Sequence, residues 1–201
     1  KLLIIDSRLN IFVVDDFNSQ TTFEKEDVKL IGNDIKSDVD RVLDSYLHDN
    51  KLFISFESIE KNECKEFKIF VAEIDSDFMK FNPFFVDNSC KSILNSGRML
   101  NFNFDQEDGL LFAVSAARYD FPTDEPQDEN SNFGKILFKG FKTKKIKVFS
   151  KGHRLILGLC VDSKNGIILS TENGPRGGDE INKIVLNGNY GWPTASYGRR
   201  Y

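Results

Sequence analysis

Residues 170–182 combine a flexible backbone with oxygen-bearing side chains, and this combination suits the binding of a hard cation. Calcium prefers oxygen ligands, which proteins supply from carboxylates and backbone carbonyls. Gly174 and Pro175, followed by Gly177 and Gly178, form a loop that can turn its carbonyls toward one point with little side-chain bulk. Glu180 adds a carboxylate. The alternative interpretation is a glycine-rich turn with an ordinary exposed Asp-Glu pair.

The chain has three cysteines, Cys64, Cys90 and Cys160, and no CxxC or Cys/His cluster, which argues against a zinc site. Cys64 opens one strand-like run and Cys90 closes the next. In an antiparallel hairpin those ends lie side by side, so a disulfide is geometrically reasonable; two free buried thiols are the alternative. Cys160 lies in an apolar run, which predicts a core position.

The composition is typical of a globular domain: 40% of the 201 residues are hydrophobic and 29% are charged. The net charge is −4, and scattered basic residues give no reason to expect nucleic-acid binding. No apolar run approaches the roughly 20 residues of a membrane-spanning helix. The chain starts without Met and stops at Tyr201 inside a motif, so we expect both ends to be cut from a longer protein, and a missing signal peptide is uninformative about export.

Short apolar runs separated by Asn, Asp, Gly and Lys predict β-strands along the whole chain. The clearest runs are 51–57, 67–74, 79–85, 98–104, 109–115, 134–139, 145–149 and 166–171. No convincing long amphipathic helix is present; residues 34–48 are the nearest candidate, but their apolar positions would also suit a strand.

A turn signal repeats before three of these strands, as Asp49-Asn50-Lys51, Glu107-Asp108-Gly109 and Lys164-Asn165-Gly166, at intervals of roughly 57–58 residues. Asp-Gly and Asn-Gly suit tight turns because Gly tolerates a positive φ. Each period holds about four strands, which is typical of a propeller blade. The sequence therefore predicts an all-β propeller with about three and a half blades, too few to close a ring; a β-sandwich is the alternative.

The segment from Thr171 to Asn182, followed by Gly188 and then Asn-Tyr-Gly-Trp-Pro, resembles the TE-x-GP-x-GGDEIN and NYGWP signature of the glucose/sorbosone dehydrogenase family. Upstream, Gln127-Asp128, Asn130-Ser131 and residues 134–137 resemble its QD-x-NS-x-x-GKIL segment. The resemblance is strongest over 96–201, and residues 1–201 are interpreted as one partial propeller domain. The family consists of six-bladed propellers that oxidise aldose sugars with pyrroloquinoline quinone (PQQ) and calcium.

The resemblance implies a calcium role for four residues. The carbonyls of Gly174 and Pro175 would hold the cofactor-side calcium, and Glu180 with the Tyr190 carbonyl would hold a second, structural calcium. Trp192, the only tryptophan, is expected to pack under the loop.

The implied quinone site is less well matched. Arg154, Asn173 and Asp179 would contact or border PQQ. The family's RNPQG motif reads Arg154-Leu-Ile-Leu-Gly here, so its Asn and Gln positions are Leu155 and Leu157. PQQ carries three carboxylates and needs cationic and amide partners, so two polar contacts are lost.

The family's general base is also missing. That base is a His just before Gly-Gly-Arg, and Leu94 stands at this position, so no catalytic residue is assigned. His153 occupies a place where the family often has a His without a catalytic role, and His48 precedes a turn and is expected at the surface. Where the family has Gly-Asp after the inner strand, this chain has Ser115-Ala116-Ala117.

Two functions remain open at this stage. One is a divergent PQQ- and calcium-dependent sugar dehydrogenase with weak or lost activity, acting on a small sugar. The other is a non-catalytic, calcium-stabilised propeller that binds a partner. By resemblance we expect a periplasmic or secreted protein.

Overall fold

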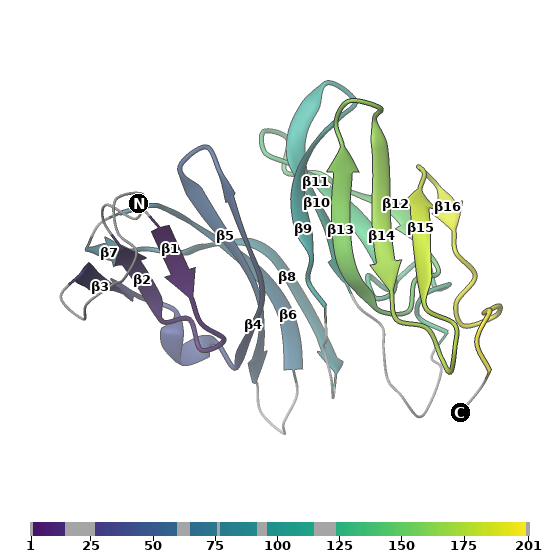
Figure 1. Cartoon of the computed structure of the whole chain (residues 1–201), viewed down its shortest axis with the longest axis horizontal. Helices are drawn as coiled ribbons and strands as arrows, with labels where there is room; N and C mark the ends of the chain where they lie inside the picture. The colour runs from purple at the N-terminus through teal and green to yellow at the C-terminus, as the bar shows by residue number, and fades with distance from the viewer. Residues whose placement is uncertain are drawn as a thin grey trace. The chain divides into compact units, whose positions relative to one another are not determined.

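A computed structural model of the chain describes residues 2–14, 27–59, 65–75, 77–91, 96–114 and 124–199. Apart from short 3₁₀ turns such as Lys36–Asp38, the regular elements are β-strands. They fall into two compact units, residues 1–90 and 91–201, each built from two sheets (Figure 1).

The first unit contains two four-stranded sheets. One has the order β1-β2-β3-β7, with strands at Leu2–Ile5, Ile11–Val14, Val28–Asn33 and Phe78–Met79. The other has the order β4-β5-β6-β8, with strands at Arg41–His48, Lys51–Ile59, Lys65–Glu73 and Asn82–Lys91. The second sheet therefore joins four strands in nearly sequential order, as a propeller blade does.

The core of the first unit draws side chains from both sheets. Ile11 and Ile31 on β2 and β3 cluster with Leu52, Ile54 and Phe56 on β5, all of them almost fully buried. β5 is buried on both faces over its interior, which explains why its apolar residues run without alternation.

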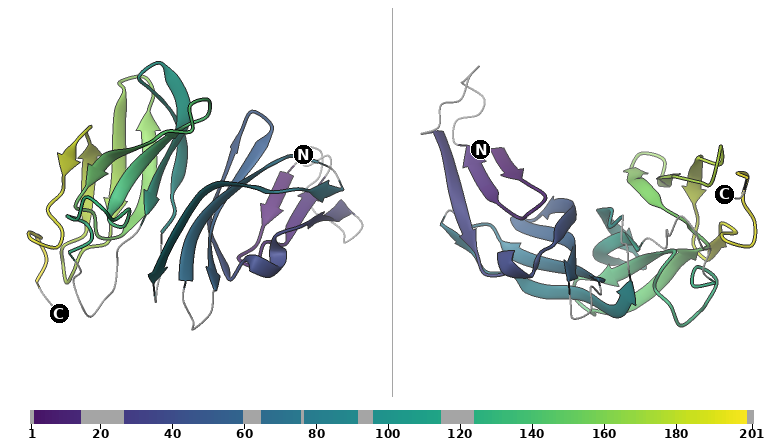
Figure 2. Two further views of the ribbon diagram at one scale, coloured as in Figure 1. Left: turned by 180° about the vertical axis from the view of Figure 1, so that it is seen from behind. Right: turned by 90° about the horizontal axis from the view of Figure 1, so that it is seen from below.

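The second unit contains a five-stranded and a three-stranded sheet. The first has the order β16-β12-β11-β10-β9, with strands at Gly188–Asn189, Ile146–Lys151, Lys135–Gly140, Glu107–Val114 and Met99–Phe104. The second has the order β13-β14-β15, with strands at Ile156–Asp162, Ile167–Glu172 and Glu180–Ile184 (Figure 2). β9 to β12 form one antiparallel meander, and the short β16 joins β12 in parallel.

The strands expected from the sequence are confirmed, with ends that differ by at most two residues, except at 79–85. There the chain changes sheets: β7 ends at Met79 beside β3, and β8 begins at Asn82 beside β6. The Phe81 amide, in the connection, donates to the Asp34 side chain at 2.9 Å. The apolar run therefore spans two elements because buried side chains, Met79 and Phe81 before the change of sheet and Phe84 and Phe85 after it, lie on both sides of it.

One expected turn is wrong by a few residues. Asp105 and Gln106, with φ of 56° and 62°, join β9 to β10, whereas Asp108 and Gly109 lie inside β10. A Cβ on Gly109 would come within 2.5 Å of the Phe138 ring on β11. This glycine is therefore required for cross-strand packing, and the sequence pattern alone could not distinguish that role from a turn.

Residues 34–48, where helix and strand were both considered, form the 3₁₀ turn and then β4. β4 pairs with β5 from Arg41 opposite Glu57 to His48 opposite Lys51. The expected turn at Asp49-Asn50 joins the two strands, with both residues at positive φ. Pairing with a buried neighbouring strand decides the conformation here. His48, expected at the surface, is half-buried and lies 3.3 Å from the Asp49 carboxylate.

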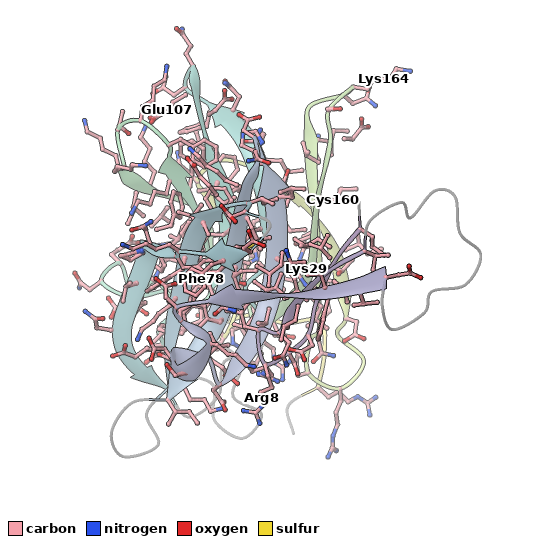
Figure 3. The ribbon with its side chains drawn as sticks, turned by 90° about the vertical axis from the view of Figure 1, so that its left-hand side faces the viewer. Arg8, Lys29, Phe78, Glu107, Cys160 and Lys164 are labelled. Carbon is pink, nitrogen blue, oxygen red and sulfur yellow. The ribbon has the colours of Figure 1, made fainter. Side chains whose placement is uncertain are left out.

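The expected core position of Cys160 is wrong, because its side chain is exposed. Figure 3 shows it on the β13–β14 hairpin, whose tip carries Lys164. The outer half of β13 is exposed on both faces, so an apolar run does not guarantee burial there. Cys64 and the side chain of Cys90 lie outside the described residues, and their bridge stays a prediction.

Candidate cation site

The loop between β14 and β15, residues 173–179, is here called the cation loop. Its glycines are required by close packing. A Cβ on Gly174 would overlap the Gly178 carbonyl, and a Cβ on Gly178 would lie 2.5 Å from the Gly198 amide nitrogen. Gly177 has a φ of 75°, a conformation that favours glycine. The glycine-rich sequence thus folds into a compact loop against the segment around residue 198.

Asp179 and Arg154 fasten this loop from two sides. The Asp179 carboxylate accepts hydrogen bonds of 3.0 Å from the Gly174 amide and from the Asn173 side chain. Arg154 Nη1 lies 2.7 Å from the Asn173 carbonyl, 2.9 Å from its side-chain oxygen and 3.3 Å from the Gly174 carbonyl. Three oxygens of the loop therefore converge on one positive charge.

A small cavity of about 10 Å³ adjoins the loop. That is about the volume needed for one water molecule or one ion. Its lining includes Gly152, Arg154, Glu172, Asn173, Gly174, Pro175, Gly178, Glu180, Tyr190, Trp192, Ala195 and Ser196. The four residues proposed from the sequence as calcium ligands, Gly174, Pro175, Glu180 and Tyr190, thus line one cavity.

The donor set of this cavity is rich in oxygen. Glu180 accepts a 3.0 Å hydrogen bond from the Asn182 side chain, which fixes its carboxylate. The Pro175 carbonyl accepts from the Gly178 amide at 2.7 Å. Within the described ranges, no three His, Cys, Asp or Glu side chains gather closely enough to share a metal ion. A cation here would therefore depend on backbone carbonyls together with few carboxylates, as calcium sites allow.

Beneath the loop lies a buried network centred on Glu172, the last residue of β14. Its carboxylate lies 2.6 Å from His153 Nδ1 and accepts from the Asn182 side chain at 3.0 Å and from the Arg154 amide at 3.2 Å. The other ring nitrogen of His153 lies 2.8 Å from the Ser150 hydroxyl. Burial raises the pKa of Glu172, but the hydrogen bond and charge of His153 outweigh it and hold that pKa below its ordinary value.

His153 also supports the segment that carries Tyr190. The two rings stack with centroids 4.5 Å apart. The Tyr190 hydroxyl donates to the Lys183 carbonyl at 2.5 Å and accepts from the Val185 amide at 3.0 Å. The half-buried Trp192 ring lies 5.4 Å from the Arg154 guanidinium, so it packs at this site as expected.

A larger pocket of about 310 Å³ also adjoins the loop and shares Glu172, Asn173 and Glu180 with the small cavity. Its lining consists of Leu157, Thr171, Glu172, Asn173, Asp179, Glu180 and Ile181. Asn173 and Asp179, which the sequence placed beside a cofactor, both border this pocket. Leu157 is 46% exposed and lines it, whereas Leu155 is 3% exposed and belongs to the core.

Residues 36–201 match the family described as Glucose / Sorbosone dehydrogenase, which is most of the chain. The chain belongs to this family. The resemblance drawn from the sequence motifs is thereby confirmed.

Three curated proteins match shorter segments of this chain. Uncharacterized protein slr1608 of Synechocystis is 36% identical over 95 residues, covering 41% of this chain and 23% of that protein. Quinoprotein glucose dehydrogenase B of Acinetobacter calcoaceticus is 47% identical over 49 residues, which is 24% of this chain and 10% of that protein. Aldose sugar dehydrogenase YliI of Escherichia coli is 40% identical over 55 residues, which is 27% of this chain and 15% of that protein. The matches thus cover a quarter or less of each relative.

Solved structures confirm the fold class. A glucose dehydrogenase crystal structure aligns with a TM-score of 0.74 at 19% identity, covering 99% of this chain and 61% of that one. The PQQ-bound aldose sugar dehydrogenase of Streptomyces coelicolor aligns with a TM-score of 0.70 at 23% identity, covering 96% of this chain and 59% of that one. The apo-form of the soluble aldose sugar dehydrogenase of Escherichia coli aligns with a TM-score of 0.69 at 19% identity, covering 96% of this chain and 59% of that one. The chain therefore has the all-β propeller fold and spans about three fifths of these neighbours.

The described residues fit the two groups that the family implies to different degrees. Calcium fits, because the carbonyl-bearing loop residues Gly174 and Pro175 and the carboxylate-bearing Glu180 line a cavity of ionic size. PQQ does not fit the larger pocket, whose described lining contains Asp179 and Glu180 but neither Lys nor Arg. Arg154 is 3% exposed and engaged with the loop carbonyls. A tricarboxylate would meet like charge there.

Sequence reasoning missed the Glu172–His153 pair and placed Leu155 beside the cofactor. The acidic residue at the end of β14 was visible in the motif, but burial and the His153 contact were required to show its role. Leu94, which stands at the position of the family's base, and residues 115–117 lie outside the described residues.

Proposed function

We propose that this chain forms the calcium-binding part of a sugar dehydrogenase-type β-propeller whose dehydrogenase activity is weak or lost. The observation that carries the proposal is the small cavity lined by Gly174, Pro175, Glu180 and Tyr190. Membership of the glucose/sorbosone dehydrogenase family supports the sugar-dehydrogenase class. Calcium would be held by the carbonyls of the cation loop and by the Glu180 carboxylate, and would tie β14, β15 and the Tyr190 segment together.

The reaction of the family, oxidation of an aldose at a CH–OH group, requires an acceptor for hydride, which PQQ supplies when bound, and a base for the hydroxyl proton. In this chain Leu94 cannot accept a proton, and Leu157 places an apolar side chain at the larger pocket. A positioned general base contributes roughly 10²–10⁴-fold, so we expect its loss alone to lower the activity by about that factor.

The lining of the larger pocket favours a second candidate, a non-catalytic binding module. Its exposed Leu157 and Ile181 flank the carboxylates of Asp179 and Glu180, a surface unsuited to an anionic quinone. In this alternative, calcium keeps a stabilising role and the pocket contacts a different ligand.

Calcium binding is tested by thermal unfolding of the full-length protein with calcium and with excess chelator. A ligand that binds only the folded state raises stability by mass action, so chelation is expected to lower the Tm. Glu180→Ala should remove most of that difference, whereas Asp162→Ala, at the β13–β14 turn, should preserve it. An unchanged Tm in chelator would refute the calcium site.

Activity is tested by dye reduction with saturating PQQ, calcium and a panel of aldoses. We expect turnover far below the median enzyme value of about 10 s⁻¹. Leu94→His combined with Leu157→Gln should raise it if the scaffold is otherwise competent. Turnover near that median in the unmodified protein would contradict the proposal, and no gain in the variant would favour the binding module.

The cellular location is part of the same proposal. We expect a periplasmic or secreted protein, in keeping with the sugar-oxidising class. In the part of the chain that the structure describes, no helix combines the length and apolar character of a membrane span.

A further inference from the structure

The loop at residues 124–131, upstream of β11, is held by a buried ammonium group. Lys135 is fully buried, and its Nζ donates to the carbonyls of Asp128 at 2.6 Å, Glu125 at 3.3 Å and Ser131. The desolvation that accompanies burial lowers the pKa of Lys135. Three carbonyls directed at one cation give this loop a defined backbone, although half of its side chains are exposed.

From this loop the side chain of Gln127 extends to the segment that contains Tyr190. Gln127 Oε1 accepts from the Asn189 side chain at 2.8 Å, and its Nε2 lies 3.1 Å from Asn189 Oδ1. The same Nε2 donates to the Trp192 carbonyl at 2.7 Å. One amide group therefore bonds to residues on both sides of Tyr190.

The backbone contacts around Gly152 make this connection close. The Gly152 amide donates to the Pro126 carbonyl at 3.1 Å, and the Gly152 carbonyl accepts from the Trp192 amide at 2.9 Å. Gly152 has a φ of 77°, and a Cβ there would collide with the Asn189 side chain. The Tyr190 amide donates to the Lys151 carbonyl at 2.9 Å. Backbone hydrogen bonds to Lys151 and Gly152 and the side-chain bonds of Gln127 therefore hold the segment on both sides of Tyr190.

We propose that Gln127 is a positioning residue for the Tyr190 carbonyl, and so sets the calcium affinity of a site that it does not touch. This inference rests on the proposed function. Gln127 is absent from the lining of the small cavity, whereas Tyr190 and Trp192 belong to it. Residues that orient metal ligands without binding the metal typically change metal affinity 10–100-fold when substituted.

The test is calcium titration by calorimetry of the chelator-treated full-length protein, together with the Tm in calcium and in chelator. We expect Gln127→Ala to weaken calcium binding at least about tenfold. Its calcium-dependent gain in Tm should shrink correspondingly. The matched control is Asn130→Ala in the same loop, whose exposed side chain contacts only Asp128 in the described bonds and should leave affinity unchanged.

Gln127→Glu covers the case in which the alanine variant does not fold. It preserves the size of the side chain but replaces the donor to the Trp192 carbonyl with a carboxylate oxygen, so the same loss of calcium affinity is expected. Wild-type affinity in a folded Gln127 variant would overturn the inference while leaving the calcium site standing. An unmodified protein that binds no calcium would overturn the proposed site itself.

Discussion

Glu57 and Glu172 occupy matching positions in two sheets, each near or at the end of a strand that follows the repeated turn. Both are almost fully buried. Glu57 Oε1 lies 2.9 Å from Arg41 Nε and 3.0 Å from Lys65 Nζ, whereas Glu172 pairs with His153. Two of the three copies of the repeat thus share a buried carboxylate with different partners, and a buried carboxylate requires such a partner.

We predict that Glu172→Gln lowers the free energy of unfolding by about 1–3 kcal/mol, because it removes a buried carboxylate that accepts hydrogen bonds from Asn182 and Arg154 and pairs with His153. Urea unfolding at neutral pH measures this. Glu129→Gln, which removes an exposed carboxylate paired with Lys151, is the control and should cost less than about 1 kcal/mol. Equal losses in the two variants would contradict the assigned role of Glu172.

The charged cluster around Lys65 predicts a pH dependence. The hydrogen bond from Lys65 holds the pKa of Asp40 below its usual range. Burial lowers the pKa of Lys65, but its hydrogen bonds to Glu57 and Asp40 outweigh burial and raise it. Asp40 therefore contributes stability above its unfolded pKa of about 3.9, and Lys65 below its unfolded pKa of about 10.4.

Lys65→Met should accordingly lower the free energy of unfolding by about 2 kcal/mol at neutral pH, since hydrogen bonds to charged groups are lost. The difference from the unmodified protein should shrink as the pH falls through the folded pKa of Asp40. Urea unfolding between neutral and acidic pH provides the comparison. A difference that stays constant over that range would exclude Asp40 as the linked group.

At the scale of elements, β5 shows how burial on both faces stabilises a sheet. Phe53 meets Phe84 edge-on with ring centroids 5.3 Å apart, and on the same strand Phe56 meets Phe70 at the same distance. Edge-to-face pairs add about 0.5–1.5 kcal/mol beyond area burial. The strand is therefore paired with β4 and β6 through its backbone and contacts β6 and β8 through its aromatic side chains.

Phe56→Ala is predicted to destabilise the protein by about 3–5 kcal/mol, because Phe56 is fully buried and its removal leaves a cavity. Ile59→Ala on the same strand, at a side chain that is 55% exposed, should have little effect. Chemical unfolding of both variants tests the contrast. A loss below about 1 kcal/mol at Phe56 would show that the site collapses or is not packed as described.

At the scale of the whole molecule, the candidate site belongs entirely to the unit at 91–201. Calcium removal should therefore loosen one unit selectively. Hydrogen–deuterium exchange of the full-length protein is expected to rise in β14, β15 and the Tyr190 segment after chelation, because local opening becomes less costly. β4 to β6 should be unchanged and act as the internal control. A uniform rise over both units would argue for global destabilisation instead.

Several features could be predicted from the sequence because they depend on local chemistry. Alternating and continuous apolar runs specify strands, and Asp49-Asn50 specifies a hairpin turn. The cation loop was recognisable because only glycine fits its positive φ and its close backbone packing. Oxygen-rich side chains at fixed spacing then indicated a hard cation.

Only the tertiary structure could decide which of these residues meet. Gln127 and Asn189 are distant in sequence, and their pairing depends on how β11, β12 and the Tyr190 segment pack. Cys160 lies in an apolar run, yet is exposed because nothing in the described structure covers the outer part of β13. Sequence by itself determined the strands and the cation loop, since these follow from each residue's own preferences. Burial and long-range hydrogen bonds decided the rest, because they depend on neighbours that the linear pattern does not specify.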